Sequence, residues 1–290
     1  MISDSHMIHG DGISATVKAA GAEVCSLKNS QGLELLWQAG PQWPRHAPLL
    51  FPIVGRLKND ELRHGGKVFP MTQHGFARDL RFDWLERSAG SCKLVLADNA
   101  ETRSRYPFAF RLTVTYALSK TGLSLSVEVT NTGEEILPAS IGLHPAFNWP
   151  LLAGVSKESY GLTFSNQEPA PIRRLKDGLL RLAPVSTPIG GNVLALSERL
   201  FDDDAVILER PASRSVRYAA DRGPAVDVSW EGFRDLGIWS KVGGAPFLCI
   251  EPWYGFASPS DFDGEFNDKP GLMKIAPAAT RSLNCHIRID

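Results

Sequence analysis

Residues 111–131 read RLTVTYALSKTGLSLSVEVTN, and their pattern is the strongest indication of how the chain folds. Apolar and polar residues alternate with a period of two on both sides of residues 120–122, which contain a glycine. Such alternation places the apolar side chains on one face of a strand. Two alternating runs joined by a short glycine-containing loop are typical of a β-hairpin. The stretch therefore predicts a hairpin with one buried face.

The same alternation recurs along the chain, whereas few stretches of helical length keep apolar residues three and four positions apart. Residues 197–201 are long enough for a single helical turn. The 26 glycines and 20 prolines divide the chain into short segments. This combination predicts an all-β fold, a large antiparallel sandwich or barrel with few short helices. Further strands are expected at residues 92–96, 205–208, 225–230, 236–239, 247–250 and 283–289.

The chain has 290 residues, which at ~150 residues per domain would suggest two domains. All-β domains of ~200–250 residues are an exception to this rule. No long linker, change of composition or internal repeat divides the sequence. Residues 169–191 hold four prolines and are interpreted as an excursion loop between strands. We therefore expect one β-domain covering residues 1–290.

The charge balance excludes several classes of partner. The chain has 31 Lys and Arg against 32 Asp and Glu, a net charge of −1. It therefore lacks the basic surplus that binds a nucleic-acid backbone. No apolar run approaches the ~18–20 residues that span a bilayer, and residues 1–11 lack the basic-then-apolar pattern of a secretory signal. We expect a soluble, cytoplasmic protein with neither nucleic acid nor membrane as partner.

The cysteines and most of the histidines are expected to have no catalytic or metal-binding role. The four cysteines are scattered without a C-x-x-C pair, and three lie in alternating apolar stretches, which favours buried reduced thiols. No paired His or His/carboxylate spacing indicates a metal site. Five histidines lie among polar or turn residues, or on the outward side of a strand, and are predicted to be solvated at the surface: His6, His9, His46, His64 and His286.

Residues 141–149 read IGLHPAFNW and place His144 directly after an apolar run. Pro145 disfavours helix at His144 and removes the next backbone donor, so a strand is expected to end there. Phe147 and Trp149 add ring faces beside it. His144 is interpreted either as a core histidine bonded to backbone or as a group that transfers protons.

Residues 247–255 read FLCIEPWYG and have the same design. An apolar strand is expected to end at Glu251, and proline and two aromatic residues follow. A carboxylate at a buried strand end is costly unless it is paired or functional. Desolvation raises its pKa and makes it a better base. The alternative interpretation is a structural ion pair with Arg56 or Arg78.

Residues 73–79, QHGFARD, form the third candidate segment. Gly75 permits a tight turn beside His74, and Arg78 offers a fork of donors for hydroxyls or a phosphate. Arg56 follows Gly55 at the end of another apolar run. Acid/base groups among aromatic rings and arginines, without a metal or cofactor, suit a neutral polar ligand such as a sugar.

Four motifs together resemble the aldose 1-epimerase (galactose mutarotase-like) superfamily, and most closely a bacterial branch of small, poorly characterised members. The similarity extends from about residue 13 to residue 289. It implies a large antiparallel β-sandwich with a sugar site in a cleft on its concave face. The motifs are Gly55-Arg56, His74-Gly-Phe, Leu143-His144-Pro-Ala-Phe-Asn and Ile250-Glu251-Pro-Trp-Tyr-Gly255.

The resemblance implies specific roles for the residues in these motifs. Glu251 would be the general base that takes the proton of the anomeric hydroxyl, and His144 the general acid that protonates the ring oxygen. His74 would assist at the ring-side oxygens, and Arg56 would hold a hydroxyl. Further sugar contacts are expected from Trp253 and Phe147.

Two features leave the ligand open. The family usually has a sugar-binding aspartate in the region that reads FDDDAV here, which favours Asp204, with Asp202 as the alternative. The motif from His74 to Arg78 resembles relatives that act on hexose 6-phosphates, whereas the residues around Arg56 resemble those that act on free sugars.

The sequence therefore predicts an isomerase, an aldose 1-epimerase that interconverts the anomers of an aldohexose without a cofactor or a metal. Two alternatives are a hexose-6-phosphate mutarotase and a non-catalytic sugar-binding protein on the same fold. Glycoside hydrolysis normally needs two carboxylates, and Glu251 alone has a suitable setting. We expect a monomer or a homodimer whose partner is a sugar, either free or phosphorylated.

Overall fold

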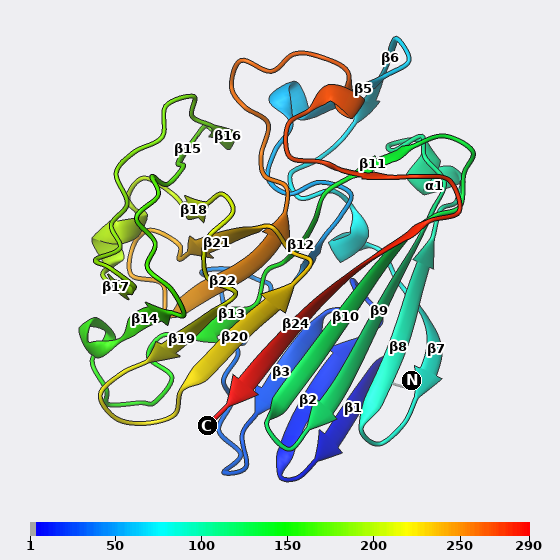
Figure 1. Cartoon of the computed structure of the whole chain (residues 1–290). Helices are drawn as coiled ribbons and strands as arrows, with labels where there is room; N and C mark the ends of the chain where they lie inside the picture. Colours follow the sequence, from blue (N-terminus) through cyan, green and yellow to red (C-terminus); the bar gives the residue numbers. More distant parts are fainter. Residues whose placement is uncertain (1–3) are drawn as a thin grey trace.

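The computed structural model describes residues 4–290 and confirms an all-β architecture (Figure 1). Residues 1–3, which belong to the N-terminal segment without a secretory signal pattern, lie outside this range. Over the described residues the chain forms 24 strands and one α-helix, α1 (Ala100–Arg103). A 3-10 turn at Glu198–Phe201 matches the single helical turn expected there. No helix within residues 4–290 has the length and apolar character needed to cross a membrane.

The largest sheet has nine strands and is built around the predicted hairpin. Strands β9 (Phe110–Ser119) and β10 (Gly122–Asn131) form this hairpin, with Leu112 opposite Val129. The C-terminal strand β24 (Thr280–Ile289) lies between β10 and β20 (Val226–Glu231). The outer strands are β8 (Ser91–Ala97) and β7 (Asp83–Arg87) on one side, and β19 (Ser215–Ala219), β14 (Gly161–Phe164) and β17 (Val193–Ala195) on the other.

A second sheet of six strands carries the candidate site residues. Its order is β18-β21-β22-β12-β4, and β13 also pairs with β22. The strand β22 (Phe247–Tyr254) is therefore central, between β21 (Asp235–Trp239) and the short strands β12 (Ile141–Leu143) and β13 (Ala146–Asn148). The remaining members are β18 (Val206–Leu208) and β4 (Leu49–Leu50).

Smaller antiparallel sheets complete the fold. In Figure 1 the blue N-terminal sheet lies behind β9 and β10, and β1 contacts both β8 and β9. Its strands are β1 (Ser5–Gly10), β2 (Ile13–Lys18) and β3 (Val24–Lys28). The two-stranded sheets are β5 (Glu61–His64) with β6 (Lys67–Pro70), β11 (Leu137–Ala139) with β23 (Met273–Ile275), and β15 (Leu175–Lys176) with β16 (Leu179–Leu180).

The alternation in the sequence fills one main core, beside which two smaller hydrophobic clusters of described residues lie. In β10 the residues Leu123 and Val127 are fully buried, while Ser124 and Glu128 are partly exposed. The main hydrophobic cluster runs from Ile8 to Ile289 and draws on strands from most of the chain. Burying apolar side chains supplies the main favourable term in folding. The single-domain organisation itself stays a prediction.

The cysteine prediction is confirmed, and one strand boundary is wrong. Within residues 4–290 all four thiols are free, and Cys92, Cys249 and Cys285 are buried. The strand that was expected to end at Glu251 continues through Pro252 to Tyr254. Pro252 pairs with Leu236 across the ladder, so β21 keeps this stretch extended although the proline lacks an N–H.

Of the five histidines predicted to be solvated, His9 is exposed and the other four are partly exposed. His6 belongs to β1 and contacts the Ser88 carbonyl. His286 contacts the Ser124 hydroxyl, and His64 packs on the Phe108 ring. His46 is half-buried, with its Nδ1 3.7 Å from the Glu23 carboxylate. Each of these four side chains finds a polar or aromatic partner that the local sequence does not reveal.

Candidate active site

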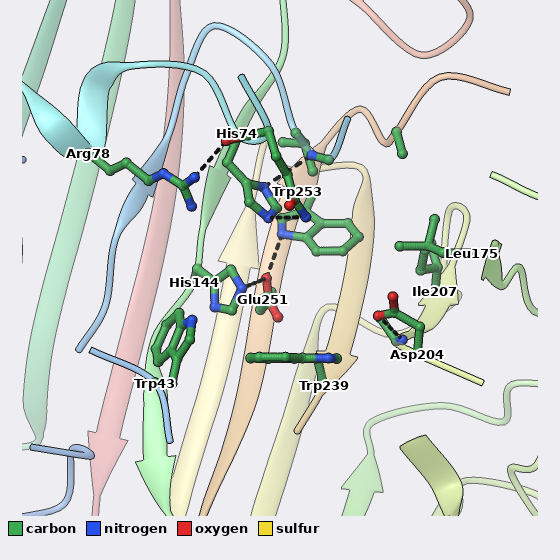
Figure 2. Close-up of a pocket in the computed structure, with 15 residues that line it drawn as sticks. Trp43, His74, Arg78, His144, Leu175, Asp204, Ile207, Trp239, Glu251 and Trp253 are labelled. Carbon is green, nitrogen blue, oxygen red and sulfur yellow. Dashed lines mark hydrogen bonds and ion pairs between the residues drawn. The ribbon is translucent and has the colours of Figure 1, made fainter. Parts of the chain in front are cut away.

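A pocket of about 250 Å³ opens over the six-stranded sheet, and it gathers most of the predicted site residues (Figure 2). A pocket of this volume suits a small polar ligand. The excursion loop contributes Leu175 of β15 to its wall. The titratable and charged groups that line it are His74, Arg78, His144, Asp204 and Glu251, and the large rings are Trp43, Trp239 and Trp253.

The sheet register brings His144 and Glu251 together. Gly142 of β12 pairs with Trp253 of β22, and Ala146 of β13 pairs with Cys249. The same register continued through the break between β12 and β13 puts His144 directly opposite Glu251. Their side chains meet, with Nε2 of His144 3.2 Å from Oε2 of Glu251. The strand end predicted at His144 is confirmed, because β12 ends at Leu143.

Glu251 is a buried carboxyl group with few polar partners. It is 1% exposed, and besides His144 it accepts a hydrogen bond from the indole N–H of Trp253 at 3.2 Å. Burial raises the pKa of Glu251 well above its usual range, and the nearby Asp204 charge raises it further, against the opposing effect of the Trp253 bond. Gly237 faces it from β21, where a Cβ would lie 2.4 Å from the Trp253 ring.

The structural ion pairs considered for Glu251 are not formed among the described residues. Arg56 donates to both carboxylate oxygens of Asp60 instead. Arg78 lies 3.7 Å from Asp79 and donates to the Gln73 carbonyl. A buried acid without a cationic guanidinium partner is the kind of group whose protonation state changes readily.

His144 is enclosed by aromatic rings at one end of the pocket. Trp43 stacks on its ring at a centroid distance of 4.9 Å, and Trp239 approaches edge-on at 5.7 Å. Burial lowers the pKa of His144 to about 3, and the charges of Arg78 and Arg45 also lower it. Within residues 4–290 no group bonds to its buried Nδ1. His144 is therefore held largely neutral, with Nε2 directed at Glu251.

The loop that carries His74 depends on the glycine beside it. His74 has a positive φ of 67° and Gly75 one of 71°. A Cβ on Gly75 would lie 2.2 Å from the Phe51 carbonyl oxygen, so only glycine fits this approach. The Gly55 N–H donates to Nδ1 of His74, which places the ring proton on Nε2. Burial lowers the pKa of His74 well below its usual range, as do the nearby His144 and Arg78.

Arg78 lies at the pocket, on the side away from Asp204 (Figure 2). Its Nη2 donates to the Gln73 carbonyl at 2.7 Å, and its buried Nε has no hydrogen-bond partner within residues 4–290. Burial lowers the pKa of Arg78 to about 10, and Arg45 contributes to this decrease. Arg45 itself pairs with Asp79 at 2.9 Å. Arg45, which does not itself line the pocket, thus places a second guanidinium group close enough to Arg78 to affect its charge.

Of the three consecutive aspartates, Asp204 is the one that lines the pocket. Its positive φ of 65° turns it toward the cavity, and its carboxylate accepts the Ala205 N–H at 2.7 Å. Asp203 pairs with Arg181 at 3.1 Å, and the exposed Asp202 ends a 3-10 turn. This placement favours Asp204 over Asp202.

The structure does not bring Arg56 or Phe147 into the pocket, so both expected contacts are corrected. Arg56 is turned outward onto Asp60 and packs beside Gly178. Phe147 is fully buried in the main core. It lies three residues from His144, and side chains an odd number of positions apart on an extended strand face opposite sides.

Trp43, Trp239 and Arg45 were missed by the sequence reasoning. Trp239 could have been found, because it ends the predicted strand over residues 236–239, next to β22. Trp43 and Arg45 lie in a loop without periodicity. The segment is fixed by Glu23, whose carboxylate accepts the N–H groups of His46 and Ala47 at 2.8 and 3.0 Å.

One set of side chains could also hold a metal ion. Ligand atoms of His144, Cys249 and Glu251 lie within 4.8 Å of one another. Cys249 precedes Glu251 by two residues on β22, so both project from the same face. The sequence offered no metal-ligand spacing for this set, because two of its members lie on one strand and the third faces them from another part of the chain.

Comparison with known proteins points to one family. A family model described as Aldose 1-epimerase matches residues 5–269. The plasmid and chromosomal forms of Protein LacX from Lactococcus lactis subsp. lactis are each 36% identical over 284 residues, which cover 94% of this chain and 95% of LacX.

Solved structures give the same result. A galactose mutarotase related enzyme from Lactobacillus acidophilus is 34% identical with a TM-score of 0.90, covering 99% of this chain and 97% of its own. A galactose mutarotase-like protein from Lactobacillus casei ATCC 334 is 32% identical with a TM-score of 0.92, covering 99% and 100%. The two similarities extend over the whole architecture, including the strands and loops that form the pocket.

Proposed function

Because this chain belongs to the aldose 1-epimerase family, whose members are isomerases, we propose that it interconverts the α and β anomers of an aldohexose. The observation that carries the proposal is the contact between His144 and Glu251 at 3.2 Å in the pocket. The two oxygens that exchange protons in this reaction, O1 and O5, are both bonded to C1 of the sugar. An acid and a base that lie side by side match this requirement.

The protonation of the pair fits the reaction. Burial opposes charge on both groups, since it raises the pKa of Glu251 and lowers the pKa of His144 to about 3. The pair therefore keeps one proton between the two side chains over a wide range of pH. A single shared proton leaves one member able to donate while the other accepts, as concerted acid/base catalysis needs.

The proposed steps conserve every proton. The shared proton, which rests on Glu251, first moves to Nε2 of His144, and the Glu251 carboxylate then accepts the proton of the O1 hydroxyl. The electrons of that O–H bond form the C1=O double bond, the C1–O5 bond breaks, and O5 takes the proton from His144. Rotation about C1–C2 presents the other face of the aldehyde, and the reverse transfers close the ring as the second anomer.

The surrounding groups have supporting roles in this proposal. His74, with its proton on Nε2, is a neutral donor for an oxygen near the ring. Trp239 offers a ring face on which the apolar side of a sugar can pack, and Trp43, which stacks on His144, also lines the pocket. Asp204, on the opposite side of the pocket from Arg78, accepts bonds from sugar hydroxyls (Figure 2). Its charge also contributes to the raised pKa of Glu251.

A 6-phosphorylated aldohexose is the second candidate substrate, and the position of Arg78 supports it. Arg78 lines the pocket, and its buried Nε has no hydrogen-bond partner in the described chain. Arg45 adds a second guanidinium group, although Asp79 competes for both arginines. Guanidinium groups bind phosphate through paired charge-assisted hydrogen bonds.

The deciding experiment is anomer exchange followed by NMR on glucose, galactose and glucose 6-phosphate. Wild type is expected to accelerate exchange of at least one sugar over buffer, and Glu251→Gln to abolish the acceleration. Arg78→Ala should reduce exchange of the phosphorylated sugar at least tenfold more than that of its free counterpart, if phosphate is bound. Arg81→Ala, a surface arginine paired with Asp4 and Asp83, is the matched control.

Two other functions are outcomes of the same experiment. No acceleration with any sugar would contradict catalysis. If sugar then binds equally well to wild type and to Glu251→Gln, the chain is a non-catalytic sugar-binding protein. Glycoside hydrolysis is disfavoured, because a retaining or inverting pair needs a second carboxyl group across the bond, and Asp204 lies with the hydroxyl-binding groups.

A further inference from the structure

Cys249 has no part in the proposed reaction, yet it lies against the two groups that perform it. It is fully buried on β22, two residues before Glu251 and opposite Ala146 of β13. Its thiol lies within 4.8 Å of ligand atoms of both His144 and Glu251. These three side chains bring a sulfur, a nitrogen and an oxygen donor to one point at the end of the pocket.

The spacing is close to that of a tetrahedral metal centre. Zinc binds sulfur at about 2.3 Å and nitrogen or oxygen at about 2.0–2.2 Å, so its ligand atoms lie roughly 3.3–3.6 Å from one another. The His144 and Glu251 atoms are already 3.2 Å apart. The thiol needs to approach by at most about 1.5 Å, which a rotation of the Cys249 and Glu251 side chains provides.

We propose that this set is an inhibitory binding site for a thiophilic divalent cation such as Zn²⁺. Thiolate, imidazole and carboxylate together select Zn²⁺ and its analogues over Mg²⁺ or Ca²⁺, which prefer oxygen ligands alone. Three protein ligands leave the fourth position open toward the pocket, because His144 and Glu251 both line it.

Charge and the second layer of contacts support the assignment. His144, Cys249 and Glu251 are 6%, 0% and 1% exposed, so the thiolate and carboxylate that form when a dication displaces their protons are neutralised in place rather than left as unpaired buried charges. The Trp253 N–H donates to the Glu251 carboxylate and orients it. Nδ1 of His144 lacks the acceptor that usually fixes a metal-bound imidazole, which favours a reversible site over a permanent one.

Cation binding should block the proposed reaction, because both use the same atoms of His144 and Glu251. A cation on Nε2 of His144 and on the Glu251 carboxylate occupies the sites that exchange protons with O5 and O1 in the proposed reaction. Inhibition therefore rests on the proposed function, whereas cation binding does not. Sugar and cation should compete, since the open metal position faces the sugar pocket.

The binding test uses Co²⁺ as a spectroscopic stand-in for Zn²⁺. Wild type should develop a near-ultraviolet thiolate-to-cobalt charge-transfer band at about one equivalent. Cys249→Ser should lose the band and weaken Co²⁺ binding more than about tenfold. The matched control is Cys25→Ser, which removes the half-exposed thiol and should keep the band. No band in wild type, or a band that depends on Cys25 rather than Cys249, would overturn the proposal.

Two further measurements keep the result interpretable. Thermal unfolding verifies that Cys249→Ser is folded, and Glu251→Gln tests the site from a second ligand, because it should also weaken Co²⁺ binding. Zn²⁺ should inhibit anomer exchange in wild type, and a chelator should reverse the inhibition. For each variant the inhibition is expressed relative to its own rate without Zn²⁺. A Cys249-dependent band without any exchange activity would leave the metal site standing and reject the epimerase. Exchange that persists at saturating Zn²⁺ would overturn the inhibitory role.

Discussion

Two glutamate–histidine pairs in this chain have opposite surroundings. In the pair Glu23–His46, the carboxylate accepts two backbone N–H groups and lies 2.5 Å from the Lys18 ammonium. In the pair Glu251–His144, the carboxyl group has one indole donor and no ammonium or guanidinium partner in the described chain. Both glutamates are less than a tenth exposed.

The contrast separates a structural carboxylate from a reactive one. Burial alone would raise the pKa of Glu23, but the bonds from His46 and Lys18 lower it to about 2. For Glu251 burial dominates and raises the pKa. The first group is fixed in one charge state because its lone pairs are satisfied. The second can change its charge state because they are not.

The largest effect is expected from Glu251→Gln. Removing the base should slow anomer exchange by about 10³-fold, within the range for loss of a general acid or base. Stability should be unchanged or higher, since an isosteric amide replaces a group that burial disfavours as an anion. A raised pKa in the folded state costs stability as pH rises above 4.5, so the variant should also lose this dependence. Anomer exchange measured by NMR tests the effect on rate, and urea unfolding at two pH values tests the effect on stability. A large loss of stability would contradict the contrast between Glu251 and Glu23.

Glu23→Gln should show the reverse pattern. A pKa that falls from 4.5 to about 2 on folding corresponds to roughly 3 kcal/mol of stability at neutral pH. The depressed value means that this contribution is present above pH 4.5 and lost as pH falls toward 2. Urea unfolding at pH 7 should therefore reveal a marked destabilisation that shrinks near pH 3. An equally stable variant at pH 7 would show that the carboxylate's partners contribute little.

The pH profile of exchange should reflect the pair rather than a free histidine. Because the pKa of His144 is lowered to about 3, the pair takes up a second proton only in strong acid. The value of kcat/KM should therefore stay level through pH 6.5, where an unperturbed histidine would titrate. It should decline at high pH, as the pair loses its remaining proton. An acid limb centred near pH 6.5, with the fold intact by circular dichroism, would disprove the shared-proton arrangement.

The smallest effect is expected from Trp43→Ala. This variant tests whether the loop that Glu23 fixes contributes to the site around His144 and Glu251. Trp43 stacks on His144, and its loop is fixed by the bonds from His46 and Ala47 to Glu23. Loss of one aromatic contact of about 0.5–1.5 kcal/mol should raise KM several-fold with a smaller change in kcat. Trp43→Phe should restore most of the affinity. A change confined to kcat would instead assign Trp43 to proton transfer.

Much of the fold could be predicted, because the alternation of apolar and polar residues that marks a strand is visible in a short stretch of sequence. The alternation in residues 111–131 predicts the β9–β10 hairpin, and the apolar run before Glu251 predicts most of β22. The end of β22 could not be predicted, since pairing with β21 outweighs the local effect of Pro252.

The residues of the candidate site could likewise be predicted only in part. His74, His144, Asp204 and Glu251 meet at one pocket as the motifs suggested. Phe147 could not be excluded from the sequence, because the strand was expected to end at His144 and the new strand β13 that buries Phe147 begins only at Ala146. The outward turn of Arg56 depends on Asp60, and the Trp43 loop depends on a glutamate twenty residues earlier, so neither has a periodic signal in the sequence.

The place of β24 has a consequence for how the protein is made. This strand lies between β10 and β20 in the nine-stranded sheet, about 150 residues after β10 ends. At ribosomal rates of about 5–20 residues per second, a nascent β9–β10 hairpin waits roughly 7–30 s for its neighbour. During that interval β10 presents an open edge with an apolar face, the kind of surface that recruits chaperones or aggregates. Synthesis from codons that slow translation between these strands would lengthen this exposure.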